Sequence, residues 1–172
     1  LHAIAANPKL CKHIHLPVQS GSDRVLDRMR RTYTRAEYLD LVAEIRSAIP
    51  EVSLSTDVIA GFPGETEPEF LETTTLMEEV QFDSAFLFKY SERRGTIAER
   101  KYADDVPEAV KSARLVRLNA LQKATARHRN QTWVGRTLPI LVEGPSRRSE
   151  DDCFGRADGN QGVVLRKAAA KP

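Results

Sequence analysis

The stretch HIHLPVQSGS at residues 13–22 decides the fold, and the stretch STDVIAGFPGET at residues 55–66 repeats its pattern. Each is a short apolar run that ends in polar and glycine-rich residues and precedes a helical pattern. In a barrel of parallel strands, the C-terminal strand ends all point to one mouth, where ligands are bound. We therefore expect Gln19, Asp57 and Gly61 to share one site, although they are dozens of residues apart.

Working outward from these stretches, the pattern predicts strands at residues 14–18, 52–59 and 83–88. Ser22 is expected to cap a short helix. Capping boxes at residues 34–37 and 66–69 predict two longer helices, of which Pro50 ends the first. Strands and helices that alternate at this spacing indicate right-handed βαβ units and a parallel sheet. Three strands cannot close a barrel, so the predicted class is α/β, the C-terminal part of a partial (β/α) barrel.

A second, smaller unit is expected after a long helix over residues 107 to about 130. The segment 107–131 carries a net charge of +5, and Val110, Leu115, Leu118 and Leu121 lie along one side. After Trp133, glycines interrupt short β-rich runs at 137–142 and 163–165, a rhythm typical of a small antiparallel barrel. We place the domains at residues 1–131 and 132–172.

The composition indicates a globular protein whose cysteines form neither a disulfide framework nor a metal site. The chain has 172 residues, of which 41% are hydrophobic and 29% charged, and its net charge of +2 does not by itself indicate a nucleic-acid binder. Cys11 and Cys153 are isolated, so we expect neither a disulfide framework nor a zinc or iron–sulfur site, and a reducing compartment fits best. No segment approaches the roughly 20 apolar residues that cross a bilayer. The abrupt start, without Met or a signal peptide, suggests part of a longer protein.

Each candidate site residue also has a plainer explanation. The amide of Gln19 suits a ribose diol but could equally satisfy a local turn. A carboxylate at Asp57, inside an apolar strand, favours a ligand site, with a structural ion pair as the alternative. Gly61 lets backbone approach a ligand before a helix N-terminus. Arg31 belongs to a basic run that is usually solvated. His13 and His15 are expected to be buried or to have their hydrogen bonds made within the protein, rather than to bind a metal.

Taken together, HLPVQSGSD (residues 15–23), MRRTYT (29–34), LSTDVIAGFPGET (54–66) and FKYSERRGT (88–96) resemble the radical-SAM methylthiotransferases. The PVQSGS form (residues 17–22) is most similar to the tRNA N6-dimethylallyladenosine methylthiotransferase (MiaB) family. That resemblance implies a radical-SAM partial barrel followed by an RNA-binding TRAM domain, here truncated. It implies methylthiolation of C2 of N6-dimethylallyladenosine next to the tRNA anticodon, in the cytoplasm and with no membrane partner.

The resemblance also implies roles for particular residues. Gln19 and Ser20 would contact S-adenosylmethionine, Gln19 through the ribose. Arg31 would pair with the methionine carboxylate, Asp57 would bind polar groups, and Gly61 would admit the adenine or ribose. Candidate phosphate contacts in the TRAM portion are Arg136, Arg147, Arg148 and Arg156, whose plainer explanation is a solvated surface. The expected partners are the tRNA anticodon stem-loop, the N-terminal half of the same protein and an electron donor.

The chain departs from the family in several places. The family's two [4Fe-4S] clusters would be held upstream, because their cysteines are absent here, and the chain alone is expected to be inactive. Arg94 stands where the family usually has Pro. Two other functions are alternatives. A ribosomal-protein aspartate methylthiotransferase is disfavoured by Ser20, and a non-catalytic RNA-binding module would not need Gln19, Arg31 and Asp57.

Overall fold

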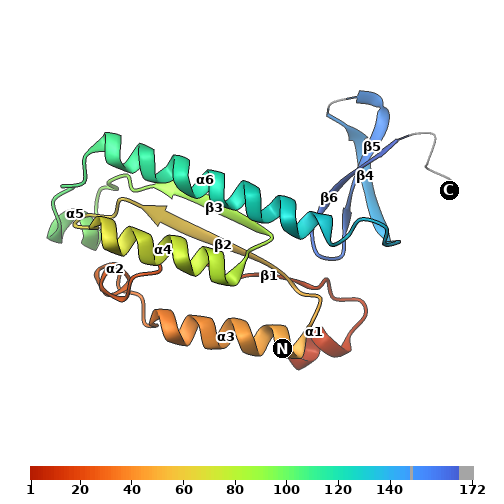
Figure 1. Cartoon of the computed structure of the whole chain (residues 1–172), viewed down its shortest axis with the longest axis horizontal. Coiled ribbons are helices and arrows are strands. Elements are labelled where there is room, and N and C mark those ends of the chain that lie inside the picture. The colour runs from red at the N-terminus through yellow and green to blue at the C-terminus, as the bar shows by residue number, and fades with distance from the viewer. Residues whose placement is uncertain (148, 167–172) are drawn as a thin grey trace.

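The computed structural model describes residues 1–147 and 149–166, which form two separate three-stranded sheets (Figure 1). The first sheet is parallel, in the order β1 (His13–His15), β2 (Ser53–Ala60) and β3 (Ser84–Lys89). The second is antiparallel, in the order β4 (Ile140–Ser146), β5 (Ser149–Ala157) and β6 (Gly162–Arg166). The predicted α/β class with an additional β unit is therefore confirmed.

Three long helices cover one face of the parallel sheet. They are α3 (Arg35–Ala48), α4 (Glu67–Val80) and α6 (Glu108–Gln131), and α4 contacts both of the others. Alternate residues of β2, namely Leu54, Val58 and Ala60, are fully or almost fully buried beneath these helices. Because side chains alternate across a strand, the residues between them lie on the opposite face.

This opposite face, which we call the open face, carries His13, His15, Ser55, Asp57, Phe86 and Phe88. Phe86 and Phe88, on the edge strand β3, are 58% and 51% exposed, which is high for large aromatic residues. The open face is therefore a surface without a covering layer among the described residues.

The first strand is shorter than the predicted 14–18, because Pro17 has no N–H to donate. The N–H of Val18 instead donates to Oγ1 of Thr56, at 2.9 Å. Pairing resumes at Gln19, whose N–H donates to the carbonyl of Asp57 and whose carbonyl accepts from Ile59. The chain therefore follows β2 as far as residue 19, although the regular strand ends at His15.

Local capping was predicted correctly at the two longer helices and incorrectly at Ser22. Capping boxes are present at Thr34 with Glu37 and at Thr66 with Glu69. Ser22 occupies the N-cap of α2 (Asp23–Arg28), but its side chain makes no capping hydrogen bond. Its N–H donates to Oγ of Ser20, which ties it to the preceding turn instead.

Three elements were not expected from the sequence: α1 (His2–Ala6), α5 (Ile97–Lys101) and β5. The two helices have five residues each, too few to show a helical period. The strand β5 has the polar sequence SEDDCFGRA and no apolar alternation. It is a strand because β4 and β6 pair with it on either side. The strand β4 starts and ends later than the predicted run 137–142, and β6 extends beyond both ends of the predicted run 163–165.

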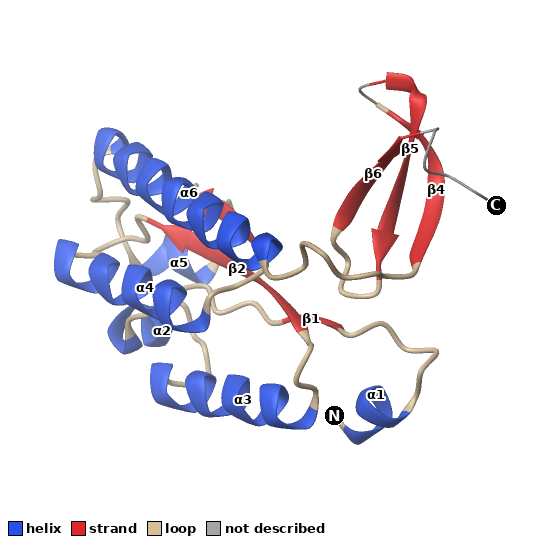
Figure 2. Ribbon diagram, turned by 45° about the vertical axis from the view of Figure 1, so that its right-hand side comes forward, coloured by secondary structure: helices blue, strands red, loops and turns tan. Residues whose placement is uncertain are grey.

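The second sheet lies beyond the C-terminal end of α6, at the opposite end of the molecule from α5 (Figures 1 and 2). Within the described ranges, no helix is long and apolar enough to span a membrane.

Candidate functional site

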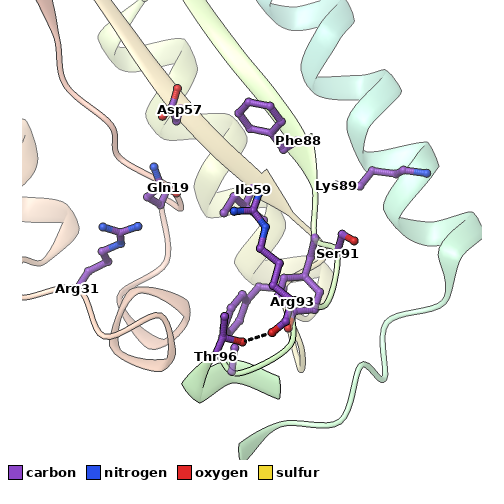
Figure 3. Close-up of a pocket in the computed structure, with 12 residues that line it drawn as sticks. Gln19, Arg31, Asp57, Ile59, Phe88, Lys89, Ser91, Arg93 and Thr96 are labelled. Carbon is purple, nitrogen blue, oxygen red and sulfur yellow. Dashed lines mark hydrogen bonds between the residues drawn. The ribbon is translucent and has the colours of Figure 1, made fainter. Parts of the chain in front are cut away.

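A cavity of about 600 Å³ lies at the C-terminal ends of β2 and β3 (Figure 3). Its size is within the usual range for small-molecule sites. The cavity is lined by Gln19, Arg31, Asp57, Ile59, Phe62, Phe88, Lys89, Tyr90, Ser91, Arg93, Thr96 and Ala98. Three of the predicted site residues, Gln19, Arg31 and Asp57, thus line one cavity.

Gln19 reaches this cavity from a left-handed backbone with a φ of 67°. A residue other than glycine rarely adopts this conformation, and such strain gathers at binding sites. The two backbone hydrogen bonds to β2, at 2.8 and 2.9 Å, hold the strained peptide in place. Gln19 is 7% exposed, so its amide is presented in a largely desolvated setting.

Arg31 is positioned by the end of helix α2. Arg30 is left-handed, with a φ of 61°, and donates its N–H to the carbonyl of Asp27. The N–H of Arg31 donates to the carbonyl of Leu26, which completes a Schellman motif. The exposed side chain of Arg31 lies on the same side of the cavity as Gln19 (Figure 3).

Asp57 lies on the open face beside the two histidines. Its Oδ1 is 3.5 Å from Nε2 of His15, and its side chain is 29% exposed. His13 and His15 both contact Oγ of Ser55, at 3.0 and 2.9 Å, as expected for satisfied histidines. Burial lowers the pKa of His13, and the neighbouring His15 lowers it further, whereas Asp83 opposes the shift. Both roles of Asp57, a ligand group and a partner for His15, are compatible with this geometry.

Ser20 and Gly61 do not line the cavity. Ser20 is fully buried and its hydroxyl contacts Oγ1 of Thr73 on α4. Gly61 has a φ of 75°, and an added Cβ would overlap the Cγ of Lys111 on α6. The structure therefore supplies a packing reason for glycine at position 61.

The turn of residues 61–66 is fixed by a residue that the sequence analysis did not select, Glu65. Its buried Oε2 accepts from the N–H of Gly61 at 2.7 Å and from Nη1 of Arg114 at 2.9 Å. Burial raises the pKa of Glu65, and the two donors oppose that shift. Arg114 also contacts Glu67, so one side chain joins α6 to the turn and to the start of α4.

The far wall of the cavity was also missed, because it comes from the end of β3 and the segment after it. Phe88, Tyr90, Arg93 and Thr96 line it. The Thr96 N–H and hydroxyl both donate to the carbonyl of Arg93, which closes a tight turn, and the Thr96 hydroxyl also caps α5. The sequence signal was present in the stretch FKYSERRGT (88–96), but no residue in it was assigned to the site.

Four of the six cations in residues 107–131 are paired with carboxylates, whereas Lys123 and Arg127 are exposed and take part in none of the ion pairs of the described residues. Lys111 and Arg114 are 3% and 4% exposed and pair with Asp104 and Glu65. Arg117 pairs with Glu67, and Arg129 pairs with Asp83. The predicted apolar side is also wrong at Val110, which is 36% exposed, whereas Lys111, Arg114 and Leu118 are the buried residues of α6. The polar groups of α6 thus lock it onto the domain.

The arginines of the second sheet differ in their surroundings. Arg136 pairs with Glu51 and Arg156 with Glu143, each at 3.0 Å. Arg147 is exposed, and Arg148 lies outside the described residues. Arg156 also lines a second cavity of about 550 Å³, to which Cys11 and His13 contribute.

No cluster of metal-ligating residues occurs in the part of the chain that the structure describes. Cys11 is exposed and Cys153 is half-buried, and each is a free thiol. The residues present do not fit an iron–sulfur cluster, which needs several thiolates together.

Comparison with known proteins identifies the class. Residues 1–77 match the radical SAM superfamily, and residues 131–172 match the TRAM domain. Coproporphyrinogen III oxidase from Escherichia coli, described as a radical SAM enzyme, has a similar fold, with a TM-score of 0.58 over 91% of this chain and 41% of that chain, at 17% identity. The chain is thus a radical SAM superfamily member with a TRAM domain.

Within that class, the chain is similar over nearly its whole length to proteins named tRNA-2-methylthio-N(6)-dimethylallyladenosine synthase. It is 53% identical to the Chlorobaculum tepidum synthase over 98% of this chain, and 53% identical to the Porphyromonas gingivalis synthase over 92% of it. The chain spans only 38% and 34% of the length of these two relatives. These names do not favour the ribosomal-protein or purely RNA-binding alternatives.

Proposed function

We propose that this chain is the C-terminal part of an enzyme that methylthiolates C2 of N6-dimethylallyladenosine next to the tRNA anticodon. The observation that carries the proposal is the convergence of Gln19, Arg31 and Asp57 in one cavity at the strand ends. The names of relatives that are half identical over nearly the whole chain support the same reaction.

The cavity is proposed to bind S-adenosylmethionine. Its lining offers an amide for the ribose diol at Gln19, a guanidinium for the carboxylate at Arg31 and an acceptor at Asp57. The aromatic ring of Phe88 adds an apolar wall. Ser20 and Gly61 would act from behind this lining, by holding the peptides that carry Gln19 and the 61–66 turn.

When bound, S-adenosylmethionine supplies the radical precursor and the methyl group of this chemistry. The part of this chain is to bind and orient that cofactor in a partly desolvated cavity. The two [4Fe-4S] clusters and the contact with an electron donor are assigned to the N-terminal half, since the described residues of this chain offer no ligand set for a cluster.

The second sheet is proposed to hold the tRNA. The TRAM match over residues 131–172 supports an RNA-binding role, and the anticodon stem-loop is the proposed ligand. The cytoplasm is the proposed location, since that is where the tRNA substrate is found.

The test uses the complete enzyme with Asp57→Ala, and Asp40→Ala as a matched control on the exposed surface of α3. Product is measured as the methylthiolated nucleoside in digested tRNA, by mass spectrometry. We expect Asp57→Ala to weaken S-adenosylmethionine binding about ten- to a hundredfold, because a polar partner is lost from a desolvated site. Product should fall accordingly, with tRNA affinity and the control unchanged. A wild-type enzyme that forms no methylthiolated nucleoside would contradict the proposal.

A further inference from the structure

We propose that Arg93 and Arg94 form a phosphate-binding site for the RNA backbone at the rim of the cavity. The inference rests on the proposed function and assigns the cavity rim a role separate from that of the TRAM arginines.

The first observation is the position of the turn. Arg93 lines the cavity, and Arg94, the next residue in the chain, is exposed. Figure 3 shows Arg31 and Arg93 extending into the cavity from opposite sides, Arg31 from the end of α2 and Arg93 from the segment after β3. Two guanidinium groups on opposite walls favour two separate anionic groups over one.

The second observation is that these charges are not neutralised by the protein. None of the ion pairs of the described residues uses Arg93 or Arg94. By contrast, Lys89 nearby pairs with Glu108, and Lys111 pairs with Asp104. Arginine that stays unpaired at a concave site is suited to a phosphate, which its planar fork can bind through two hydrogen bonds.

The third observation is that hydrogen bonds within the segment hold the turn. The carbonyl of Arg93 accepts from Thr96, and Gly95, with a φ of 80°, donates its N–H to Glu99. The carboxylate of Glu99 is thus hydrogen-bonded to the turn, and the carboxylate of Asp105 accepts from the N–H of Gly64, so both have partners other than the two arginines. Glu92 precedes the two arginines in the chain, and its negative charge offsets part of their positive charge. A turn held by hydrogen bonds keeps its charges in place at a small entropic cost on binding.

The occupant follows from the proposed substrate. A base that enters the cavity must leave its stack, and the phosphates on either side of it then lie at the rim. With one arginine, Arg31, assigned to the cofactor carboxylate, Arg93 and Arg94 remain for those phosphates. Arg94, which is exposed, supplies a cation that can take a second phosphate contact.

The experiment measures the salt dependence of binding of an RNA anticodon hairpin to the complete enzyme, for the wild type and for Arg93→Ala/Arg94→Ala. Each lost phosphate contact removes about 0.7–0.9 from the log–log slope, so we expect the slope to flatten by about one to two units. Arg93→Lys/Arg94→Lys should retain the slope, because it keeps both charges. Lys9→Ala is the control for loss of a positive charge elsewhere, since residue 9 follows α1, at the other end of the domain from α5 (Figure 1).

S-adenosylmethionine affinity, titrated on the same proteins, separates the inference from the proposed function. An unchanged slope in the double alanine variant overturns the inference and leaves the proposed function standing. The inference also fails if that variant loses S-adenosylmethionine affinity instead, or if Lys9→Ala flattens the slope equally. A wild type that binds no hairpin even at the lowest salt overturns both.

Discussion

Gln19 combines the two properties of a ligand-binding residue in a single position. Its backbone is left-handed, and its side chain lines the cavity while the residue as a whole stays nearly buried. Local strain of this kind persists only where surrounding contacts hold it, here the paired hydrogen bonds to β2.

From this we expect Gln19→Ala to weaken S-adenosylmethionine binding about ten- to a hundredfold, because one polar partner is removed from a desolvated site. The control is Gln81→Ala. Gln81 is an exposed glutamine that also has a left-handed backbone, with a φ of 51°. Calorimetric titration of each variant checks the prediction. If both glutamine variants bind equally well, position 19 has only a backbone role.

Glu69 gives the clearest pH dependence at the residue scale. Arg24, followed by the N–H and hydroxyl of Thr66, holds the pKa of Glu69 at about 2, below the usual 4.5, although burial opposes the shift. Since the folded pKa is depressed, Glu69 contributes stability above about pH 4.5, and this is lost as the pH falls towards 2.

We therefore expect Glu69→Gln to lower the free energy of unfolding at pH 7, by roughly 1–3 kcal/mol. The difference from the wild type should shrink as the pH falls below about 4.5, because the unfolded chain then takes up a proton that the folded carboxylate, with its pKa of about 2, does not. Urea unfolding at pH 7 and at about pH 3 measures both values. A difference that is the same at the two pH values would show that the charge of Glu69 is not responsible.

At the scale of elements, the 61–66 turn and helix α6 are packed as one unit. Gly61 leaves room for the Lys111 side chain, which in turn pairs with Asp104 at 2.5 Å. Arg114 binds Glu65 in the same interface. The helix therefore supports the turn from behind, on the side away from the open face.

This packing predicts that Gly61→Ala destabilises the domain more than Gly95→Ala does. Both glycines have a left-handed backbone, with φ values of 75° and 80°, so both substitutions introduce similar strain. A Cβ at position 61 also overlaps Lys111, whereas nothing lies within 4 Å of a Cβ at position 95. Overpacking of this kind costs about 1–3 kcal/mol. Thermal unfolding of the two variants tests this, and equal melting temperatures would refute the packing argument.

At the scale of the whole molecule, the proposed RNA contacts lie in two regions, the cavity rim and the TRAM portion. In the TRAM portion, Arg136 and Arg156 are already paired with carboxylates, whereas Arg147 is exposed. A paired arginine must exchange one partner for another, so its net gain on binding a phosphate is smaller.

We accordingly expect Arg147→Ala to reduce the salt-dependence slope of tRNA binding to the complete enzyme by about 0.7–0.9. Arg156→Ala should change the slope less, because Glu143 already neutralises that charge. Filter binding over a range of salt concentrations distinguishes them, with S-adenosylmethionine affinity as a control that stays constant. A larger effect at Arg156 than at Arg147 would reverse this assignment.

The sequence by itself determined the features that depend on short-range physics. Short apolar runs, two capping boxes and the spacing of strands and helices were sufficient for the α/β class and a parallel sheet. The same reasoning located Gln19 and Asp57 at neighbouring strand ends, because parallel strands end at one edge. The domain boundary at 131/132 stays a prediction, next to the end of α6 at Gln131.

Only the tertiary structure decided which charged residues, remote from each other in the sequence, form ion pairs. Lys111 and Arg114 have the composition of a solvated basic helix, yet they are buried, because Glu65, 49 residues away from Arg114, and Asp104 meet them there. The polar strand β5 exists because both of its neighbours supply hydrogen bonds. Arg93 faces Arg31 across the cavity only because the turn after β3 folds back over it. Periodicity and capping act over a few residues, whereas pairing between remote groups depends on the path of the whole chain.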